Sequence, residues 1–508
     1  MSGTLHDAPP RDEATRDAAQ LYFDHAATTP VDPEVARAMA DCLAAGLGNP
    51  AATHPAGRAA RERLEAARAE IARTVGAEEP AAIVFTSGAT EADNLAILGI
   101  ARAHADRARH VITARTEHRA VLDACARVER EGGRVTYLST DRAGRIDVAQ
   151  VRDALRPDTV LVSLMLVNNE TGLVHDLAPV GALCRERGVA FHVDAAQAVG
   201  RVPLDVQALG ADLVALSAHK CHGPAGVGAL YVRRRPRPAL LPLQFGGGQE
   251  GGLRSGTPPL HQAVGMAEAY RLLRERHPDE PSRLAALRDR LWTGLAPLGG
   301  LHRNGDPERS APHILSVSVE GVDGEALVAA LDDLALASGA ACSSATREPS
   351  YVLRALGRDD PLAQATLRLS LGRTTTTAQV DRAVERVGQE VRRLRALAPG
   401  PLEPAESGRD WIEGEAREPL TGTHVRWRLR VVGGRIVEAR WRARGCPHTL
   451  AACEIVATRL HGLVPGDLRL DTPGIAQAIG APPDKLGRLF VIEDALQGAA
   501  LQVRPSTA

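Results

Sequence analysis

The sequence predicts an α/β protein with a mostly parallel sheet, followed by a smaller α+β region and a separate C-terminal α+β domain. Between residues 21 and about 262, short apolar runs alternate with amphipathic helical stretches, the order of a sheet built from strand–helix–strand units. Several runs are apolar at every position, as expected for strands covered on both faces. The pattern changes near residue 263, and again after a proline- and glycine-rich segment near residue 400.

The large domain is expected at about residues 31–262. Helical stretches such as 59–74 and 120–131 lie between its strands. The predicted strands are residues 82–85, 110–114, 134–138, 160–167, 189–193, 213–217 and 229–232. Residues 1–20 are polar and charged and lack the apolar centre of a signal peptide, so we expect a flexible tail.

The small domain is expected at about residues 263–397, together with the N-terminal segment, so that both domains lie within residues 21–397. Its predicted elements are helices at 263–277, near 324–334 and at 377–397, and strands at 314–319 and 367–371. Proline, glycine and charged residues then predict a linker at 398–408.

Residues 409–508 form the expected C-terminal domain. Apolar residues from Val425 to Val431 alternate with arginines, and Gly433-Gly434 separates this run from a second one at 436–443. This pattern predicts a β-hairpin, followed by helices at 447–460 and 483–501.

Composition excludes several function classes. The formal net charge of −1 gives no attraction to nucleic acid or a membrane surface, and no apolar run is long enough to span a bilayer. The chain has 7 cysteines in 508 residues and no CxxC pair, which indicates a reducing cytoplasm rather than a disulfide framework. The abundance of arginine and alanine suggests a bacterial genome rich in GC.

Lysine is rare in this chain, and Lys220 occupies a special position. Of the 61 lysines and arginines, only Lys220 and Lys485 are lysines. A lysine amine can lose its proton and form a Schiff base with an aldehyde, which a guanidinium cannot do. Lys220 follows the apolar run 211–219 and precedes the glycine-rich turn 223–228, where a bound molecule can approach the backbone closely. We therefore expect Lys220 to hold a cofactor.

Three further features suit pyridoxal phosphate as that cofactor. Residues 86–91 (TSGATE) follow a strand and open a helix, whose N-terminus can bind phosphate. Asp194 follows a strand and can pair with a pyridinium nitrogen, although a helix N-cap is an ordinary alternative. His118 can stack on the ring or move protons, although a buried structural histidine is equally common. Their order at strand ends favours the cofactor.

These residues also carry a family resemblance. Residues 22–397 resemble the NifS/IscS-type cysteine desulfurases, which are fold-type I pyridoxal-phosphate enzymes. The matching motifs are residues 22–30 (YFDHAATTP), 86–91 (TSGATE), 116–118 (TEH), 167–172 (VNNETG), 194–197 (DAAQ), 217–220 (SAHK), 254–257 (RSGT) and 338–344 (SGAACSS). His25 stands where the family usually has tyrosine.

The resemblance implies a role for each matching residue. Lys220 is the implied Schiff-base lysine, Asp194 the partner of the pyridine nitrogen, and His118 the stacking acid/base. Gln197 would contact the ring phenolate oxygen, and Asn169 and Arg368 the substrate carboxylate. The implied phosphate contacts are Ala89, Thr90, Ser217 and His219, with Thr257 supplied by the second subunit of a homodimer.

Cys342 is the implied sulfur-accepting nucleophile. It lies in a stretch of small residues, 337–345, that has no strong helical or strand period, so a loop is expected. A thiolate there would take sulfur from the substrate as a persulfide and carry it to an acceptor. Cys221 lies beside Lys220 but matches no nucleophile of the family.

The C-terminal domain resembles the U-type iron–sulfur scaffold proteins (IscU/NifU) but lacks most of their cluster ligands. Thr421, Thr423, Gly487 and Arg488 stand at the other ligand positions, and only Cys446 matches a ligand cysteine. The other cysteine of this domain, Cys453, lies seven residues further, too far along one helix to share a small metal ion. We therefore expect no metal centre, but a sulfur acceptor at Cys446 or a docking module.

The sequence thus predicts a cysteine desulfurase that converts L-cysteine to L-alanine and passes sulfur from Cys342 to an acceptor protein or to its own C-terminal domain. That sulfur would serve the synthesis of iron–sulfur clusters or other cofactors. Two alternatives remain open at this point. One is selenocysteine lyase or another fold-type I enzyme, and the other is a docking platform without catalysis, which the presence of Lys220 and Cys342 argues against.

Overall fold

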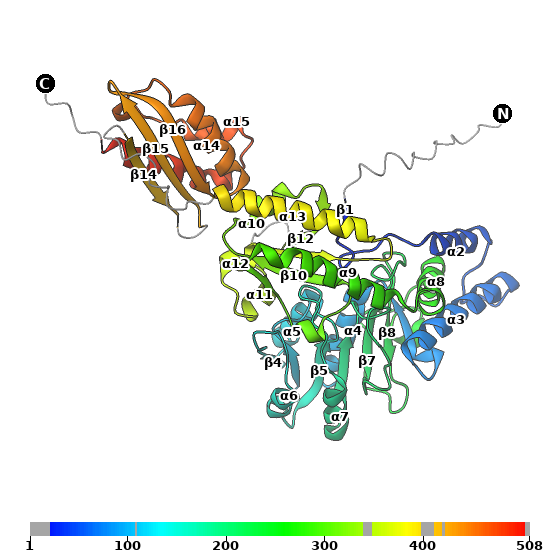
Figure 1. The fold of residues 1–508 in the computed structure, drawn as a ribbon. Helices are drawn as coiled ribbons and strands as arrows, with labels where there is room; N and C mark the ends of the chain where they lie inside the picture. Colours follow the sequence, from blue (N-terminus) through cyan, green and yellow to red (C-terminus); the bar gives the residue numbers. More distant parts are fainter. Residues whose placement is uncertain (1–20, 107–108, 339–347, 398–410, 419–421, 503–508) are drawn as a thin grey trace, which may run out of the picture. The chain divides into compact units, whose positions relative to one another are not determined.

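The computed structural model describes residues 21–106, 109–338, 348–397, 411–418 and 422–502 (Figure 1). The chain divides into two compact units. The larger unit consists of Asp24–Gly324 and Ala337–Thr374, and the smaller unit of Met1–Phe23, Glu325–Leu336 and Thr375–Ala508. The predicted domain boundaries near residues 262 and 397 remain predictions.

The larger unit is built around a seven-stranded sheet of order β2-β8-β7-β6-β5-β3-β4. Its strands are β2 (Ile83–Thr86), β3 (His110–Ala114), β4 (Arg134–Leu138), β5 (Thr159–Met165), β6 (Ala190–Asp194), β7 (Leu213–Ser217) and β8 (Gly228–Val232). Strand β8 is antiparallel to both neighbours, and the other pairs are parallel. The mostly parallel sheet and all seven predicted strands are confirmed, with ends that differ by one or two residues.

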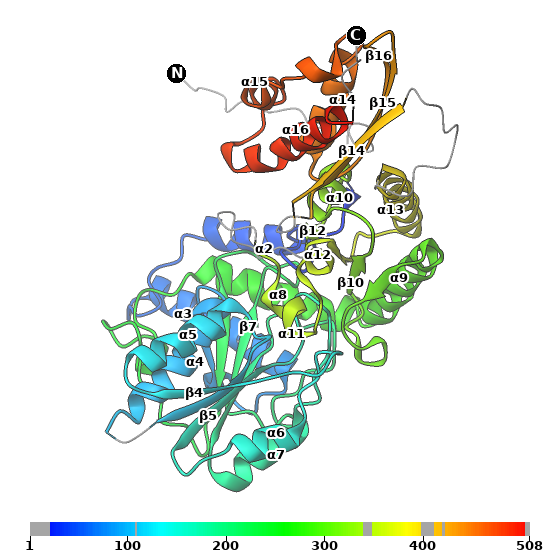
Figure 2. The same ribbon diagram turned by 90° about the vertical axis from the view of Figure 1, so that its left-hand side faces the viewer.

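Helices cover both faces of this sheet (Figure 2). Helices α4 (Ala89–Ala103) and α5 (Arg119–Arg130) share one apolar core with the strands. Helices α3 (Pro55–Val75), α7 (Ala178–Arg187) and α8 (Leu260–Arg276) contribute to the core on the other face. Two-sided burial explains why β2, β3, β5, β7 and β8 are apolar or small at nearly every position.

A four-stranded antiparallel sheet completes the larger unit. Its order is β12-β13-β10-β9, with β9 (Leu301–Arg303), β10 (Ile314–Val319), β12 (Ala337–Ser338) and β13 (Thr366–Ser370). Helices α9 (Glu280–Leu295) and α12 (Asp360–Gln364) pack on β10, and α11 (Tyr351–Ala355) lies against α12. Helices α2 (Pro33–Ala44) and α6 (Val148–Ala154) belong to the first sheet, where α2 packs on α8 and α6 on α7 and β4. Neither β9 nor α9 was predicted from the sequence. Strand β9 has only three residues and shows no period, whereas α9 buries leucines at helical spacing (Leu284, Leu287, Leu291 and Leu295), a signal that was available.

The C-terminal part of the smaller unit is a three-stranded antiparallel sheet with helices on one face. Its elements are β14 (Trp411–Arg417), β15 (His424–Val432), β16 (Arg435–Arg444), α14 (Pro447–Arg459), α15 (Thr472–Ala478) and α16 (Leu486–Ala500). The predicted hairpin and two helices are confirmed, whereas β14 and α15 were not predicted. In β14, a Cβ at Gly414 would lie 1.9 Å from the carbonyl oxygen of Ala495, so only glycine lets α16 pack this closely.

The same unit contains α10 (Gly324–Ala330), α13 (Thr377–Leu397) and the parallel pair β1 (Leu21–Tyr22) and β11 (Leu334–Ala335). Lys485 is 3% exposed, and its ammonium lies 2.7 Å from the Glu325 carboxylate. The second lysine of the chain is therefore buried and paired with a partly exposed carboxylate on α10. No helix among the described ranges has the length and hydropathy needed to cross a membrane.

Candidate active site

A cavity of about 460 Å³ lies in the larger unit, where the parallel strands end at their carboxyl edge. Ligands of open α/β sheets bind at this edge. Ten of the predicted site residues line the cavity: Ala89, Thr90, His118, Asn169, Asp194, Gln197, Ser217, His219, Lys220 and Arg368. The fold therefore gathers residues that are up to 279 positions apart in the chain (89 to 368) around one space.

Lys220 and Asp194 form the charged centre of the cavity. Asp194 is 6% exposed at the end of β6, and its Oδ1 accepts the backbone N–H of Ala196 at 2.9 Å. Burial lowers the pKa of Lys220, and the nearby Asp194 carboxylate offsets this only in part. A lowered pKa favours the neutral amine, which is the form that can bond to an aldehyde.

His118 caps helix α5 and faces the cavity. Its Nδ1 accepts the backbone N–H of Ala120 at 3.2 Å, which leaves the proton of the neutral ring on Nε2. Burial lowers the pKa of His118, while the Asp194 charge acts in the opposite direction. The ring is therefore held neutral in a fixed tautomer, with Nε2 available for proton transfer.

The residues at one end of the cavity fit a phosphate. Helix α4 begins there with Gly88 as N-cap and no side-chain cap, so its first N–H groups point toward the space. The buried hydroxyl of Ser217 also has no hydrogen-bond partner among the described residues. His219 bonds to the Thr28 hydroxyl at 3.1 Å beside it. These donors match the needs of the phosphate group of pyridoxal phosphate.

Arg368 and Gln197 hold other sides of the cavity. The Arg368 guanidinium donates to the carbonyl oxygen of Asn169 at 2.9 Å and to Asp24 at 2.7 Å. Gln197 donates to the carbonyl oxygen of Ala26 at 2.8 Å. Arg368 is only 7% exposed, so its position is set by these contacts and by the sheet rather than by solvent.

Three predicted residues are not in the cavity lining. Thr257 is exposed and lies outside it. Cys342 falls in 339–347, outside the described residues. Cys446 is in the smaller unit, where it is fully buried as the N-cap of α14. Near Lys220, Cys221 is buried and burial raises the pKa of its thiol to about 11, which argues against a nucleophilic role.

Sequence reasoning missed Asp93 and the buried carboxyl of Glu117. Asp93 is 1% exposed and lines the cavity from helix α4. Glu117 is fully buried and accepts the backbone N–H of Met165 at 3.0 Å. Asp93 lies three residues after Thr90, one helical turn below the expected phosphate site. This spacing was the only feature of the sequence that could have placed Asp93 at the cavity.

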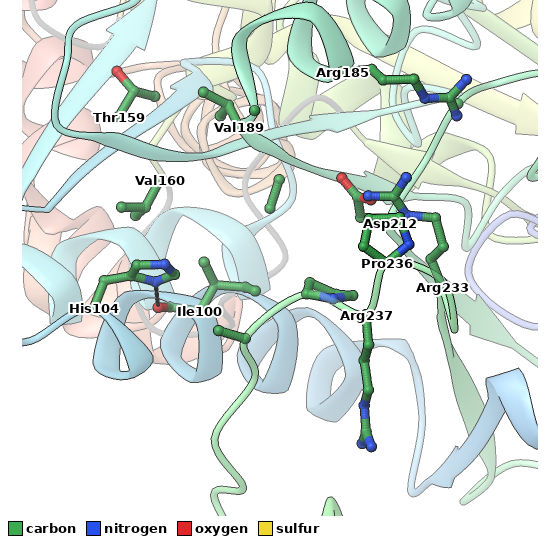
Figure 3. A pocket seen from close by; sticks show the side chains of 15 residues that line it. Ile100, His104, Thr159, Val160, Arg185, Val189, Asp212, Arg233, Pro236 and Arg237 are labelled. Atoms are coloured by element: carbon green, nitrogen blue, oxygen red, sulfur yellow. Dashed lines mark hydrogen bonds and ion pairs between the residues drawn. The ribbon is translucent and has the colours of Figure 1, made fainter.

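A second cavity, of about 440 Å³, lies at the opposite edge of the same sheet (Figure 3). Thr159 and Ala190 open strands β5 and β6 there, and Asp212 forms an ion pair with Arg233. None of the predicted site residues lines it. The functional groups therefore concentrate at the carboxyl edge.

Comparison with known proteins defines the class of this fold and site. The model of the aminotransferase class-V family matches residues 21–383. Among solved structures, a NifS-like protein superposes with a TM-score of 0.69 and 34% identity, over 74% of this chain and 100% of that one. DndA from Streptomyces lividans does so with a TM-score of 0.60 and 40% identity, over 69% of this chain and 99% of that one. The class is that of fold-type I pyridoxal-phosphate enzymes.

Curated relatives narrow this class. The cysteine desulfurase IscS of Pectobacterium atrosepticum is 53% identical over 382 residues, which are 75% of this chain and 94% of the relative. The cysteine desulfurase IscS of Salmonella typhi is 52% identical over the same shares. The chain belongs to the cysteine desulfurases of the aminotransferase class-V family, and its cofactor is pyridoxal phosphate.

Proposed function

We propose that the cavity binds pyridoxal phosphate through Lys220 and that the enzyme removes sulfur from L-cysteine, leaving L-alanine. The arrangement of Lys220, Asp194 and His118 beside the uncapped N-terminus of α4 supports this proposal most strongly. When bound, the cofactor supplies an electron sink for the bond-breaking step. Asp194 would hold its ring nitrogen, and Gln197 its phenolate oxygen.

The remaining cavity residues would bind substrate and move protons. The Asn169 amide and the Arg368 guanidinium would orient the cysteine carboxylate, since Arg368 is already fixed by Asp24. His118 would carry a proton at Nε2, because its Nδ1 is occupied by a backbone N–H.

Cys342 is proposed as the nucleophile that receives sulfur. Its thiolate attacks the substrate sulfur, the carbon–sulfur bond breaks, and sulfur stays on Cys342 as a persulfide while the carbon product takes up a proton as alanine. The residues flanking 339–347 support this role. Strand β12 pairs with β13 next to Arg368, and after the segment Tyr351 donates to the carbonyl oxygen of Glu117 at 2.7 Å. Both ends of the segment are therefore attached close to the cavity.

Thr257 supports a homodimer as the working form. It is exposed and lies outside the cavity of its own chain, which suits a contact with the phosphate site of a second subunit. The acceptor of the sulfur is proposed to be a partner protein or the C-terminal domain, and the compartment a bacterial cytoplasm.

The C-terminal domain is proposed to derive from the U-type scaffold proteins and to dock partners or accept sulfur. Both of its cysteines, Cys446 and Cys453, are fully buried, and burial raises the pKa of Cys453. Cys446 Sγ lies 3.4 Å from the Thr449 hydroxyl. Transfer to Cys446 would therefore require α14 to open at its N-terminus, which favours docking over transfer.

The two roles of this domain can be separated by mass spectrometry after the protein is exposed to L-cysteine. Docking alone predicts no persulfide on Cys446. A persulfide on Cys446 in the wild type that disappears in Cys342→Ser would instead establish transfer.

The activity is tested by incubating the purified protein with L-cysteine and a thiol, then assaying alanine and sulfide. Lys220→Arg should lose the absorbance band that borohydride reduces, because the guanidinium cannot bond to the cofactor aldehyde. Cys342→Ser should keep that band and lose sulfide release. Cys221→Ser is the matched control and should keep both. A Cys342→Ser protein that turns over cysteine at the wild-type rate contradicts the proposed nucleophile.

A further inference from the structure

A buried line of polar groups ends in the cavity and has no role in the function proposed above. Ser163 and His192 face each other across β5 and β6, with Ser163 Oγ 2.9 Å from His192 Nδ1. On the other side of the imidazole, His192 Nε2 lies 3.5 Å from Asp93 Oδ1. Ser163 and His192 are fully buried and Asp93 is 1% exposed, yet Asp93 also lines the cavity.

The strand register places this line directly beneath Asp194. His192 and Asp194 are two residues apart on β6, so their side chains point to the same face of the sheet. Asp93 approaches this face from helix α4, which shares an apolar core with the strands. Neither Asp93 Oδ1 nor His192 Nε2 has a hydrogen-bond partner among the described residues, so the 3.5 Å approach between them is the polar contact they have. A buried carboxyl oxygen in this condition is costly unless it has a function or holds a proton.

The charges around Asp93 determine its protonation state. The ionisable groups nearest to it are Asp194 on β6, Glu117 after β3 and Lys220 after β7, besides His192. Burial raises the pKa of Asp93, the charges of Asp194 and Glu117 raise it further, and Lys220 opposes them. Burial also lowers the pKa of His192 to about 4. Burial and the neighbouring carboxylates therefore favour the protonated form of Asp93, and burial favours the uncharged form of the imidazole beside it.

We infer that Asp93 is a positioning residue, which lies against the imidazole that Ser163 orients and which acts on the cofactor through Asp194. As a neutral acid, it fills the end of the cavity near Asp194 with a fixed polar group and leaves the negative charge on Asp194. The ring nitrogen of the cofactor then meets one carboxylate rather than two. This inference rests on the proposed function of Asp194, and it assigns Asp93 no contact with the reacting atoms.

The test compares Asp93→Asn, Asp93→Leu and Ser163→Ala by two readouts that do not depend on turnover. The first is the dissociation constant of pyridoxal phosphate for the cofactor-free protein, and the second is the pH titration of the bound chromophore. Asp93→Asn keeps a neutral polar group, so it should stay within about threefold of the wild-type dissociation constant. Asp93→Leu should weaken binding by about tenfold or more. It should also displace the chromophore titration by about half a pH unit or more.

Ser163→Ala removes only the outer hydrogen bond and should shift both readouts in the same direction as Asp93→Leu, but less. The matched control is Ser318→Ala, which removes another fully buried serine hydroxyl, bonded to Asn304 and Thr366, away from the cavity. It should change neither readout.

Wild-type behaviour of Asp93→Leu overturns the inference. So does an equally large change in Asp93→Asn and Asp93→Leu, because Asp93 would then act as an ionised carboxylate. If Asp93→Leu does not fold, Ser163→Ala tests the inference in its place. An effect of Ser163→Ala no larger than that of Ser318→Ala then refutes the positioning role of Asp93. A borohydride-reducible band in Lys220→Arg would refute the proposed function instead, so the two failures can be distinguished.

Discussion

Replacing Arg368 by lysine tests how the cavity recognises its substrate. The two terminal nitrogens of the guanidinium already donate to the Asn169 carbonyl oxygen at 2.9 Å and to Asp24 at 2.7 Å. The Nε–H has no partner among the described residues but is itself buried, so a ligand carboxylate would meet the second N–H of each terminal nitrogen. A lysine ammonium carries its three donors on one atom and cannot reach all these directions at once.

The expected loss follows from this geometry. Arg368→Lys keeps the positive charge but gives up at least one charge-assisted hydrogen bond, which contributes about 1.5–3 kcal/mol. The value of kcat/KM for L-cysteine should therefore fall by about 10- to 150-fold. The borohydride-reducible band of the cofactor should be retained. Steady-state alanine formation over a range of cysteine concentrations separates the effects on kcat and KM.

Asp24→Asn is the control for this experiment, because it weakens the support of Arg368 without removing the guanidinium. Its kcat/KM should fall less than that of Arg368→Lys. A kcat/KM for Arg368→Lys within about threefold of the wild type would refute the assigned role. A larger loss in Asp24→Asn than in Arg368→Lys would also contradict the assigned role, because the guanidinium would then matter less than its support.

Three further predictions concern pH, stability and assembly. Because burial lowers the pKa of His118, its neutral form persists below the usual histidine value of about 6.5, and the acid limb of kcat/KM should lie below that pH; an acid limb above pH 6.5 argues against His118 as the proton carrier. Glu250→Gln should lower the free energy of unfolding, measured by urea titration, by about 3 kcal/mol or more, because it leaves buried Arg68 without its carboxylate at 2.6 Å. Its control is Glu65→Gln, on the exposed side of Arg68, which should lower the same free energy by less than about 1 kcal/mol. Thr257→Val should weaken pyridoxal phosphate binding in a protein that sediments as a dimer, and a monomer with full activity would contradict the shared site.

Local patterns predicted most of the larger unit. The strands β3 and β7 match the predicted residues, because a strand buried on both faces is mostly apolar along its whole length. The edge strand β4 also matches, although most of its residues are only partly buried. Helix α13 also matches, since its apolar residues repeat with the helical period. Strand β14 was missed because its buried face contains glycine and alanine, which give no apolar alternation.

The sequence by itself determined which chemical groups are available: a lysine in a chain of arginines, a helix start suited to phosphate, and the ordered motifs of the desulfurases. Only the tertiary structure decided which of these groups meet. It brought Arg368 from a separate sheet to the cavity, set Asp93 against His192, and buried Cys446 where the sequence suggested a reactive thiol. Burial and contacts between distant residues arise from the packing of whole elements, and no local period of the sequence encodes them.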